Sequence, residues 1–259
     1  MKCAFFSLTD TGRVRANNED ALAIVPEAGL VVLADGMGGY NAGEVASALA
    51  TETVVARLGT SMPGQQTGHH RLTQALTEAI RAANRAVFDA SRSEYDLRGM
   101  ATTLVAGVFA GARLVIAHVG DSRVYRFRQG HLARLTRDHS LLQQQVDAGL
   151  ISPELARLAQ HKNLVTRAIG VAASVDIDMQ EHVVQPGDTY LFCSDGLNDM
   201  LTDAQMAAIL RHHPPLEHAA RALLDSANAA GGHDNISLVL VHCAPESTRQ
   251  TPDPTLLTH

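Results

Sequence analysis

Four aspartates in this 259-residue chain stand where an apolar stretch gives way to glycine or a small polar residue. They occur in the sequences Leu33-Ala34-Asp35-Gly36, Val119-Gly120-Asp121-Ser122, Cys193-Ser194-Asp195-Gly196 and Gly232-His233-Asp234-Asn235. Short apolar runs of this kind are typical of strands buried on both faces of a sheet. An acidic side chain at a strand end is held by rigid backbone and reaches open space, which is what a site for a hard cation needs.

Turn formation is the main alternative explanation, because aspartate before glycine is above all a turn residue. It explains any one of the four aspartates taken alone. The set of four, with Glu19 and Asp20 upstream, is hard to explain by turns, since the neighbouring apolar stretches resemble interior strands. Carboxylate ligands favour Mg²⁺ or Mn²⁺ over zinc. The glycines from residue 36 to 43 resemble a nucleotide-binding loop only loosely, because no Gly-Lys-Ser/Thr follows them.

The composition excludes several classes of protein. A formal net charge of −6 and an aromatic content of 4% argue against a general nucleic-acid binder. The three cysteines lack the paired spacing of a zinc or redox motif, so we expect reduced, buried thiols. Because the amino-terminal apolar stretch is too short for a signal peptide and no run is long enough to span a membrane, we expect a cytoplasmic protein without membrane contact.

The hydrophobic pattern predicts alternating groups of strands and helices. Strands are expected at residues 30–34, 102–109, 113–119, 123–128, 131–135, 189–194 and 235–243, with those from 102 to 135 forming an antiparallel meander. Helices are expected at about 44–58, 72–91, 140–148, 154–158 and 216–229, and from Thr202, where Gln205 completes a capping box. The sequence contains no evident linker. We therefore expect a single catalytic domain over residues 1–243, a flap at about 138–170 and a disordered tail at 244–259.

Several short motifs, taken together, resemble those of the protein phosphatase 2C family of metal-dependent protein serine/threonine phosphatases. The motifs are Arg15, Glu19-Asp20, Asp35-Gly36-Met37-Gly38-Gly39, Ala101-Thr102-Thr103, Gly120-Asp121-Ser122-Arg123, Ser194-Asp195-Gly196 and Asp234-Asn235. Their order and approximate spacing match the family over residues 4–243, and 138–170 resembles the flap of bacterial members. The resemblance implies an α+β fold, an α-β-β-α sandwich in which helices flank two central antiparallel sheets.

The resemblance also implies a two-metal site of Mn²⁺ or Mg²⁺. Asp35 is expected to bridge the two ions, and the Gly36 carbonyl to be a ligand of one. Asp195 and Asp234 are expected to complete the shell of one metal, and Glu19 to act at the other, directly or through water. Two such ions activate a bridging water and stabilise the in-line displacement at phosphorus.

Further roles follow from the same family pattern. Asp121, with Asp195, matches a weaker third metal site. Asp20 and Asn235 are expected to lie behind the ligands, where Asp20 orients waters. Arg15 is expected to bind two phosphate oxygens, a bidentate contact for which lysine is a poor substitute. Arg123 is expected to have a structural role, pairing locally.

One position departs from the eukaryotic pattern. Met37 replaces a histidine that is the proposed general acid in those relatives. Protonation of the leaving oxygen is therefore assigned to metal-bound water or to another side chain, with His139 and His161 as candidates.

These inferences predict a monomeric phosphatase that acts on phosphorylated proteins and opposes a bacterial serine/threonine kinase. One rival is a pseudo-phosphatase that only binds partners; it is disfavoured because every metal-ligand position is filled. A second rival is a metal phosphoesterase acting on nucleotides or nucleic acid, which the acidic charge and scarce aromatic residues disfavour. The sequence does not identify the kinase or the phosphoprotein.

Overall fold

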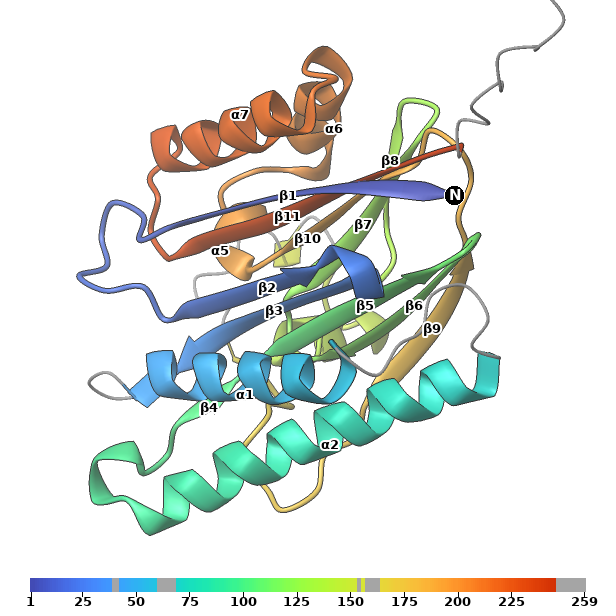
Figure 1. The fold of residues 1–259 in the computed structure, drawn as a ribbon. Coiled ribbons are helices and arrows are strands. Elements are labelled where there is room, and N and C mark those ends of the chain that lie inside the picture. Colours follow the sequence, from blue (N-terminus) through green and yellow to red (C-terminus); the bar gives the residue numbers. More distant parts are fainter. Residues whose placement is uncertain (39–41, 60–68, 153–154, 157–163, 246–259) are drawn as a thin grey trace, which may run out of the picture.

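The structure is a computed structural model that describes residues 1–38, 42–59, 69–152, 155–156 and 164–245. Its strands form two antiparallel sheets that face each other (Figure 1). One sheet has the order β1 (Lys2–Asp10), β11 (Ile236–Ala244), β10 (Thr189–Cys193), β7 (Arg123–Arg128) and β8 (His131–Arg134). The other has the order β2 (Asp20–Val25), β3 (Leu30–Met37), β5 (Leu104–Ala110), β6 (Arg113–Val119) and β9 (Asp178–Val183), with β4 (Ala101–Thr102) paired to β3.

Helices cover the outer face of each sheet (Figure 1). The long helices α1 (Ala42–Leu58) and α2 (His69–Ser93) pack on the sheet that contains β3, whereas α6 (Asp203–His212) and α7 (Leu216–Ala229) pack on the sheet that contains β11. The shorter elements are η1 (Pro26–Ala28), η2 (Tyr95–Leu97), α3 (Leu141–Asp147) and α5 (Asp195–Asn198). The expected α-β-β-α sandwich is therefore confirmed.

Three apolar cores hold these four layers together. The core between the sheets includes Val31, Leu33, Val105 and Val239. Separate cores lie under the helices on each side, for example around Ile80 beneath α2. Strands such as β3 and β5 are buried on both faces, which explains why their sequences are continuous apolar runs without alternation.

The connections bring the four aspartates to one end of the sandwich. β3 and β10 end there, β11 begins there, and the chain crosses from β6 to β7 there. This crossing corrects the expected meander at 102–135, because β6 and β7 lie in different sheets. The expected strand at 102–109 is also divided in two, as β4 and β5.

Several sequence expectations were incomplete or wrong. β1, β2 and β9 were not predicted. The expectation of reduced thiols is wrong for Cys3 and Cys243, which the pairing of β1 with β11 places opposite each other and which form a disulfide. It is confirmed for Cys193, a buried free thiol. The capping box at Thr202 is confirmed. Of the expected helix at 154–158, only residues 155 and 156 are described, and both are helical; part of the flap and nearly all of the tail lie outside the described residues.

Candidate metal centre

Asp35 lies near the end of β3, where the chain leaves the interior of the sandwich. Its neighbour across β2 is Asp20, and the Gly36 N–H donates to the Glu19 carbonyl over 3.1 Å. A Cβ atom on Gly36 would collide with the Gly43 and Glu19 backbones. Glycine is therefore required for the first turn of α1 to approach β3 so closely.

The other three aspartates flank strands of the facing sheet. Asp195 is the first residue of α5 and is separated from the end of β10 by Ser194 alone. Asp234 precedes β11, and its Oδ1 accepts the Asn235 N–H over 2.9 Å. Asp121 occupies the crossing between β6 and β7 and is almost fully buried, with 8% of its surface exposed. Each carboxylate is thus placed by the end of a paired strand.

Asn235 connects the two sheets at this point. Its Oδ1 accepts the Glu19 N–H over 2.8 Å, and its Nδ2 donates to the carbonyls of Thr11 and Asn17 at 3.0 and 2.9 Å. A single amide side chain therefore fixes the segment that carries Glu19. Ser194 has a similar function, because its Oγ donates to Asp20 Oδ2 over 2.8 Å.

These side chains surround a cavity of about 200 Å³. Eight of the nine residues expected at the site line it, namely Arg15, Glu19, Asp35, Gly36, Asp121, Asp195, Asp234 and Asn235. Asp20 lies behind the lining. The expectations did not include Asn17, Gly38, Thr103 and Val165, which also line the cavity. A neighbouring cavity of about 390 Å³ shares Asp121 and Asp195 and extends toward α3.

The carboxyl groups of this cluster are buried and close together, and this raises their pKa values. Burial raises the pKa of Asp35 and of Asp195 well above the ordinary value, and the neighbouring aspartates raise it further. Burial also raises the pKa of Asp20 to about 6 and that of Asp121 to about 6. Carboxylates gathered without a compensating cation favour protonation, and bound divalent cations remove that preference.

The donor set fits hard divalent cations. The lining offers carboxylate oxygens from five acidic residues and backbone carbonyls, but no imidazole or thiolate. Within the described residues, Asp20 Oδ1 is buried without a hydrogen-bond partner beside this cluster. Oxygen ligands of this kind suit Mg²⁺ and Mn²⁺.

Arg15 enters the cavity from the exposed edge. Its Nη2 donates to Asp234 Oδ2 over 2.7 Å, and this bond raises the pKa of the guanidinium. The side chain is 54% exposed, which leaves it accessible to a ligand in the cavity. Arg123, by contrast, is directed away and donates to both carboxylate oxygens of Asp138 at 2.6 to 3.1 Å, in agreement with its expected structural role.

The described lining of the cavity offers no histidine that could act as the general acid. Met37 lines it but carries no dissociable proton. His139 is not among the lining residues and hydrogen-bonds to Gly120 instead. His161 lies outside the described residues. No histidine in the described part of the chain lines the cavity.

Comparison with known proteins gives a consistent set of matches. The family model for protein phosphatase 2C matches residues 11–236. The serine/threonine phosphatase Stp of Listeria monocytogenes serotype 4b is 39% identical over 239 residues, covering 90% of this chain and 93% of that protein. The crystal structure of the Mycobacterium tuberculosis phosphatase PstP/Ppp superimposes with a TM-score of 0.86 at 38% identity, covering 94% of this chain and 100% of that one.

A further structure bears on the metals. It contains the catalytic domain of the serine/threonine protein phosphatase PstP in complex with two manganese ions. It superimposes with a TM-score of 0.84 at 38% identity and covers 93% of this chain and 98% of that one. Among the described residues of the present chain, none of the helices has both the length and the apolar character needed to cross a membrane.

Proposed function

The chain belongs to the protein phosphatase 2C family, and on that premise we propose that its acidic cavity is the active site. The protein is a metal-dependent protein serine/threonine phosphatase, which hydrolyses phosphate esters of serine and threonine side chains and uses Mn²⁺ or Mg²⁺. One observation carries the assignment of the site. Carboxylates from both sheets converge on one cavity of about 200 Å³, at the point where Arg15 enters it.

We propose that Asp35, Asp195, Asp234 and the Gly36 carbonyl hold two core cations, with Glu19 acting directly or through water. Bound divalent cations supply positive charge to the phosphate ester and lower the pKa of coordinated water. The protein fixes the positions of its oxygen ligands beforehand. β3, β10 and β11 hold the three aspartate backbones, so little rearrangement is needed on binding.

Asp20 and Asn235 support these ligands from behind. Asn235 fixes Glu19 through the 2.8 Å bond to its N–H, and Asp20 is paired with Asp35 across the strands. We propose that Asp121 contributes to a third, weaker cation site together with Asp195, since both residues also line the neighbouring cavity. Asp20 and Asn235, by contrast, are proposed to tune the affinity for the ions without binding them.

We propose that Arg15 orients the substrate. Its guanidinium has the planar geometry to bind two phosphate oxygens, and it is held at the cavity by Asp234. When a phosphate group enters the cavity, Arg15 can exchange its hydrogen bond to the Asp234 carboxylate for hydrogen bonds to the phosphate oxygens. Met37 supplies no proton, so the leaving oxygen depends on another source.

We further propose that residues 1–243 form one catalytic unit, that the protein is a monomer, and that its substrates are products of a bacterial serine/threonine kinase. Protein kinases transfer phosphate from ATP, so a phosphatase that opposes one is expected in the cytoplasm. Cell fractionation with activity measurement tests the location, and light scattering coupled to gel filtration tests the monomeric state.

The activity is tested by phosphate release from a phosphothreonine peptide. We expect turnover with Mn²⁺ that stops with EDTA and returns when excess Mn²⁺ is added. Asp89 lies exposed on α2, so Asp89→Asn is a matched control for substitutions of the cavity aspartates. Metal-independent turnover, or binding of phosphopeptide without turnover, would contradict the assignment.

A further inference from the structure

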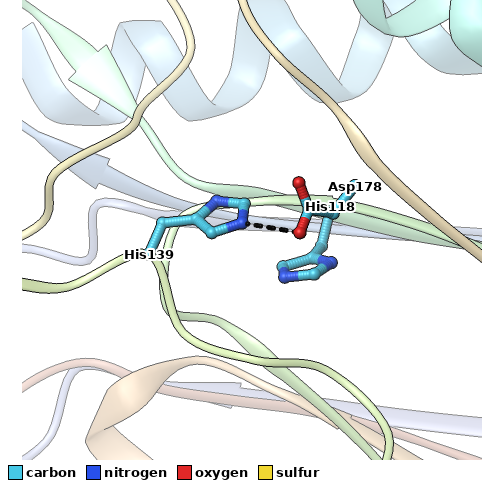
Figure 2. Close-up of side chains that lie close together, drawn as sticks. All are labelled: His118, His139 and Asp178. Carbon is cyan, nitrogen blue, oxygen red and sulfur yellow. Dashed lines mark ion pairs between the residues drawn. The ribbon is translucent and has the colours of Figure 1, made fainter. Parts of the chain in front are cut away.

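A second polar cluster lies outside the cavity lining. It consists of His118 on β6, His139 between β8 and α3, and Asp178 at the start of β9 (Figure 2). His139 Nε2 lies 3.3 Å from an Asp178 carboxylate oxygen, and the two imidazole rings stack with centroids 4.6 Å apart. His118 and His139 are 1% and 8% exposed, whereas the Asp178 side chain is 47% exposed.

Metal binding is the first function to consider, because the candidate ligand atoms of the three residues lie within 4.8 Å of one another. The hydrogen bonds argue against it. His139 Nδ1 accepts the Gly120 N–H over 3.1 Å, so the ring proton is on Nε2, where a metal would need a lone pair. The rings are stacked with their planes inclined by only 18°, so their in-plane lone pairs lie in two nearly parallel planes and do not converge well on one ion. Arg167 Nη1 also lies 2.6 Å from Asp178 and would repel a cation.

His139 instead holds the residue before Asp121. Besides the bond to its ring, Gly120 accepts the His139 N–H at its carbonyl over 2.9 Å, so both polar backbone groups of Gly120 bond to one residue. Gly120 has φ 108°, and a Cβ there would lie 2.6 Å from Thr103 Cβ. The backbone at Gly120 is therefore fixed by hydrogen bonds on one side and close packing on the other.

The residue after Asp121 is held by a different contact. Ser122 Oγ lies 2.7 Å from Thr103 Oγ1, and the same Thr103 oxygen accepts the Asp35 N–H over 3.0 Å. Thr103 thereby connects the turn at Asp121 to the proposed bridging ligand. The Asp121 carboxylate hydrogen-bonds to its own backbone, whereas the contacts that tie this turn to the rest of the fold are those of its two neighbours.

We propose that His139 and Asp178 are positioning residues for the phosphatase reaction, which set the place of Asp121 through Gly120. The inference rests on the role proposed above for Asp121. With Nδ1 accepting the Gly120 N–H, the ring proton is on Nε2, which faces an Asp178 carboxylate oxygen at 3.3 Å and also lies 3.1 Å from Arg167 Nη1. The Asp178 carboxylate thereby favours the tautomer in which Nδ1 is free to accept the Gly120 N–H.

The surroundings of the cluster favour a neutral His139 ring. Burial lowers the pKa of His139, and the neighbouring His118 and Arg167 lower it further against the opposing effect of Asp178. The ring is therefore neutral at pH 7. Burial acts to raise the pKa of Asp178, but hydrogen bonds from Arg167 and His139 outweigh it and keep that pKa below the ordinary value.

Hydrogen bonds of His139 and Asp178 also hold a second part of the cavity wall. The Thr166 N–H donates to the His139 carbonyl over 2.8 Å, and Arg167 donates to Asp178. Val165, next to Thr166, lines the metal cavity. His139 thus ties the turn at Asp121 and the segment around Val165 to one another, from a position outside the cavity.

Calorimetric titration with Mn²⁺ and steady-state kinetics on a phosphothreonine peptide test the proposal. In His139→Ala, we expect the affinity of the weaker Mn²⁺ site and kcat each to fall at least tenfold, with the tight sites and KM changed less than threefold. His139→Asn should restore most of both, because its amide oxygen can accept the Gly120 N–H. His182→Ala, a half-buried histidine farther along β9, is the matched control and should match wild type.

Asp178→Ala and Asp178→Asn keep the test valid should His139→Ala fail to fold, because Asp178 is half-exposed. We expect Asp178→Ala to weaken the same Mn²⁺ site at least threefold, and Asp178→Asn to resemble wild type because its carbonyl still accepts from Nε2. The proposal is wrong if folded Ala variants at both positions keep weak-site affinity and kcat within twofold, or if Asp121→Asn leaves the weak site unchanged.

A failure of the proposed function would give a different result, because wild type itself, and not only the variants, would then lack Mn²⁺-dependent turnover. The Mn²⁺ titrations of wild type and of the His139 and Asp178 variants still test the positioning role in that event. A wild-type protein with no weaker Mn²⁺ site would overturn the positioning role of His139 and Asp178 while leaving the activity assignment intact.

Discussion

Arg15 donates a 2.7 Å hydrogen bond to Asp234, so the arginine proposed to bind phosphate holds a carboxylate proposed to bind metal. The arginine side chain is 54% exposed and the aspartate 25%. An ion pair this exposed adds only about 0 to 1 kcal/mol to stability. The pair therefore matters for the proposed site rather than for stability, because the Arg15 guanidinium competes with a metal ion for the Asp234 carboxylate.

Arg15→Ala is expected to raise KM for phosphopeptides at least tenfold while Mn²⁺ affinity stays equal or increases, because Asp234 loses a competing cation. Arg15→Lys should recover only part of the KM effect, since an ammonium group does not bind two oxygens in a planar fork. Kinetics and Mn²⁺ calorimetry measure the two effects separately. Arg113→Ala, which breaks the exposed 2.6 Å pair with Glu181 at the other end of β6, is the matched control. Normal KM with weakened Mn²⁺ binding would contradict this division of roles.

Asp35→Asn and Asp195→Asn are each expected to lose three or more decades in rate, about 4 kcal/mol of transition-state stabilisation. The reason is that each substitution removes a charged ligand from the proposed metal centre. Activity in saturating Mn²⁺ is the measurement, with circular dichroism to establish folding and Asp89→Asn as control. A folded variant that kept more than a tenth of wild-type activity would exclude its aspartate from the core site.

The crowded carboxyl groups predict a pH dependence of the metal-free protein. Burial raises the pKa of Asp20 and of Asp121 from 3.8 to about 6 in the folded state. Their stabilising contribution is therefore complete below pH 3.8 and is lost as pH rises through 6. For Asp121 the loss is about 3 kcal/mol at most, from two pKa units.

Thermal unfolding in EDTA between pH 4 and 7.5 measures this effect. Relative to wild type, Asp121→Asn should gain stability as pH rises from 4 to 6 and then stay level. Added Mn²⁺ should reverse the order of the two proteins near pH 7, because cations stabilise the ionised wild-type site. A difference between the two melting curves that does not change with pH would show that Asp121 ionises as freely in the folded state as in the unfolded state.

Much of the cavity lining could be predicted from the sequence, because Asp35, Asp121 and Asp195 each follow an apolar run that indicates an interior strand, and Asp234 precedes one. Thr103 shows the limit. Its hydroxyl joins Asp35 to Ser122, two residues far apart in the chain, and no local pattern indicates such a contact. The crossing at Gly120 was likewise missed, since periodicity shows that two strands follow one another but not that they lie in different sheets.

The strands that were missed have a common physical cause. β9 has the sequence Asp178-Met179-Gln180-Glu181-His182-Val183, and as an edge strand it buries little apolar surface. β1 is only partly buried along its length. Strands at sheet edges are placed by hydrogen bonds to a neighbour, which leaves a weak signal in the sequence. Missing β1 also concealed the pairing of Cys3 with Cys243.

The Cys3–Cys243 disulfide closes a loop of 240 residues, so reduction should destabilise the protein without changing its activity. In the chain-entropy view, a loop of this length is worth about 5 kcal/mol at most. We expect a reductant to lower Tm of wild type by several degrees and to leave Cys3→Ser unaffected, because that variant has no bond to break. Activity should match in all cases, since the bond lies at the end of β11 remote from Asp234. Equal Tm for wild type with and without reductant would show that the two thiols are not joined in solution.

Asp121 makes the most discriminating prediction, because it lies where the two cavities of about 200 and 390 Å³ meet. Asp121→Asn is expected to keep the tight Mn²⁺ sites, to lower kcat and to shift the Mn²⁺ concentration needed for activity. Since Met37 supplies no proton, we expect the leaving oxygen of a phosphothreonine to depend on proton donation near Asp121.

Two substrates separate that role from a general loss of activity. An aryl phosphate has a leaving group that departs with little protonation, so Asp121→Asn should lower its kcat by less than threefold. The same variant should lower kcat on a phosphothreonine peptide at least tenfold, because an alkoxide leaving group needs the proton. Asn198→Asp, which adds a carboxylate to the wall of the larger cavity, is a charge control that should not restore the peptide activity of Asp121→Asn. Equal losses on both substrates would rule out the leaving-group role, and unchanged activity on both would remove Asp121 from the site.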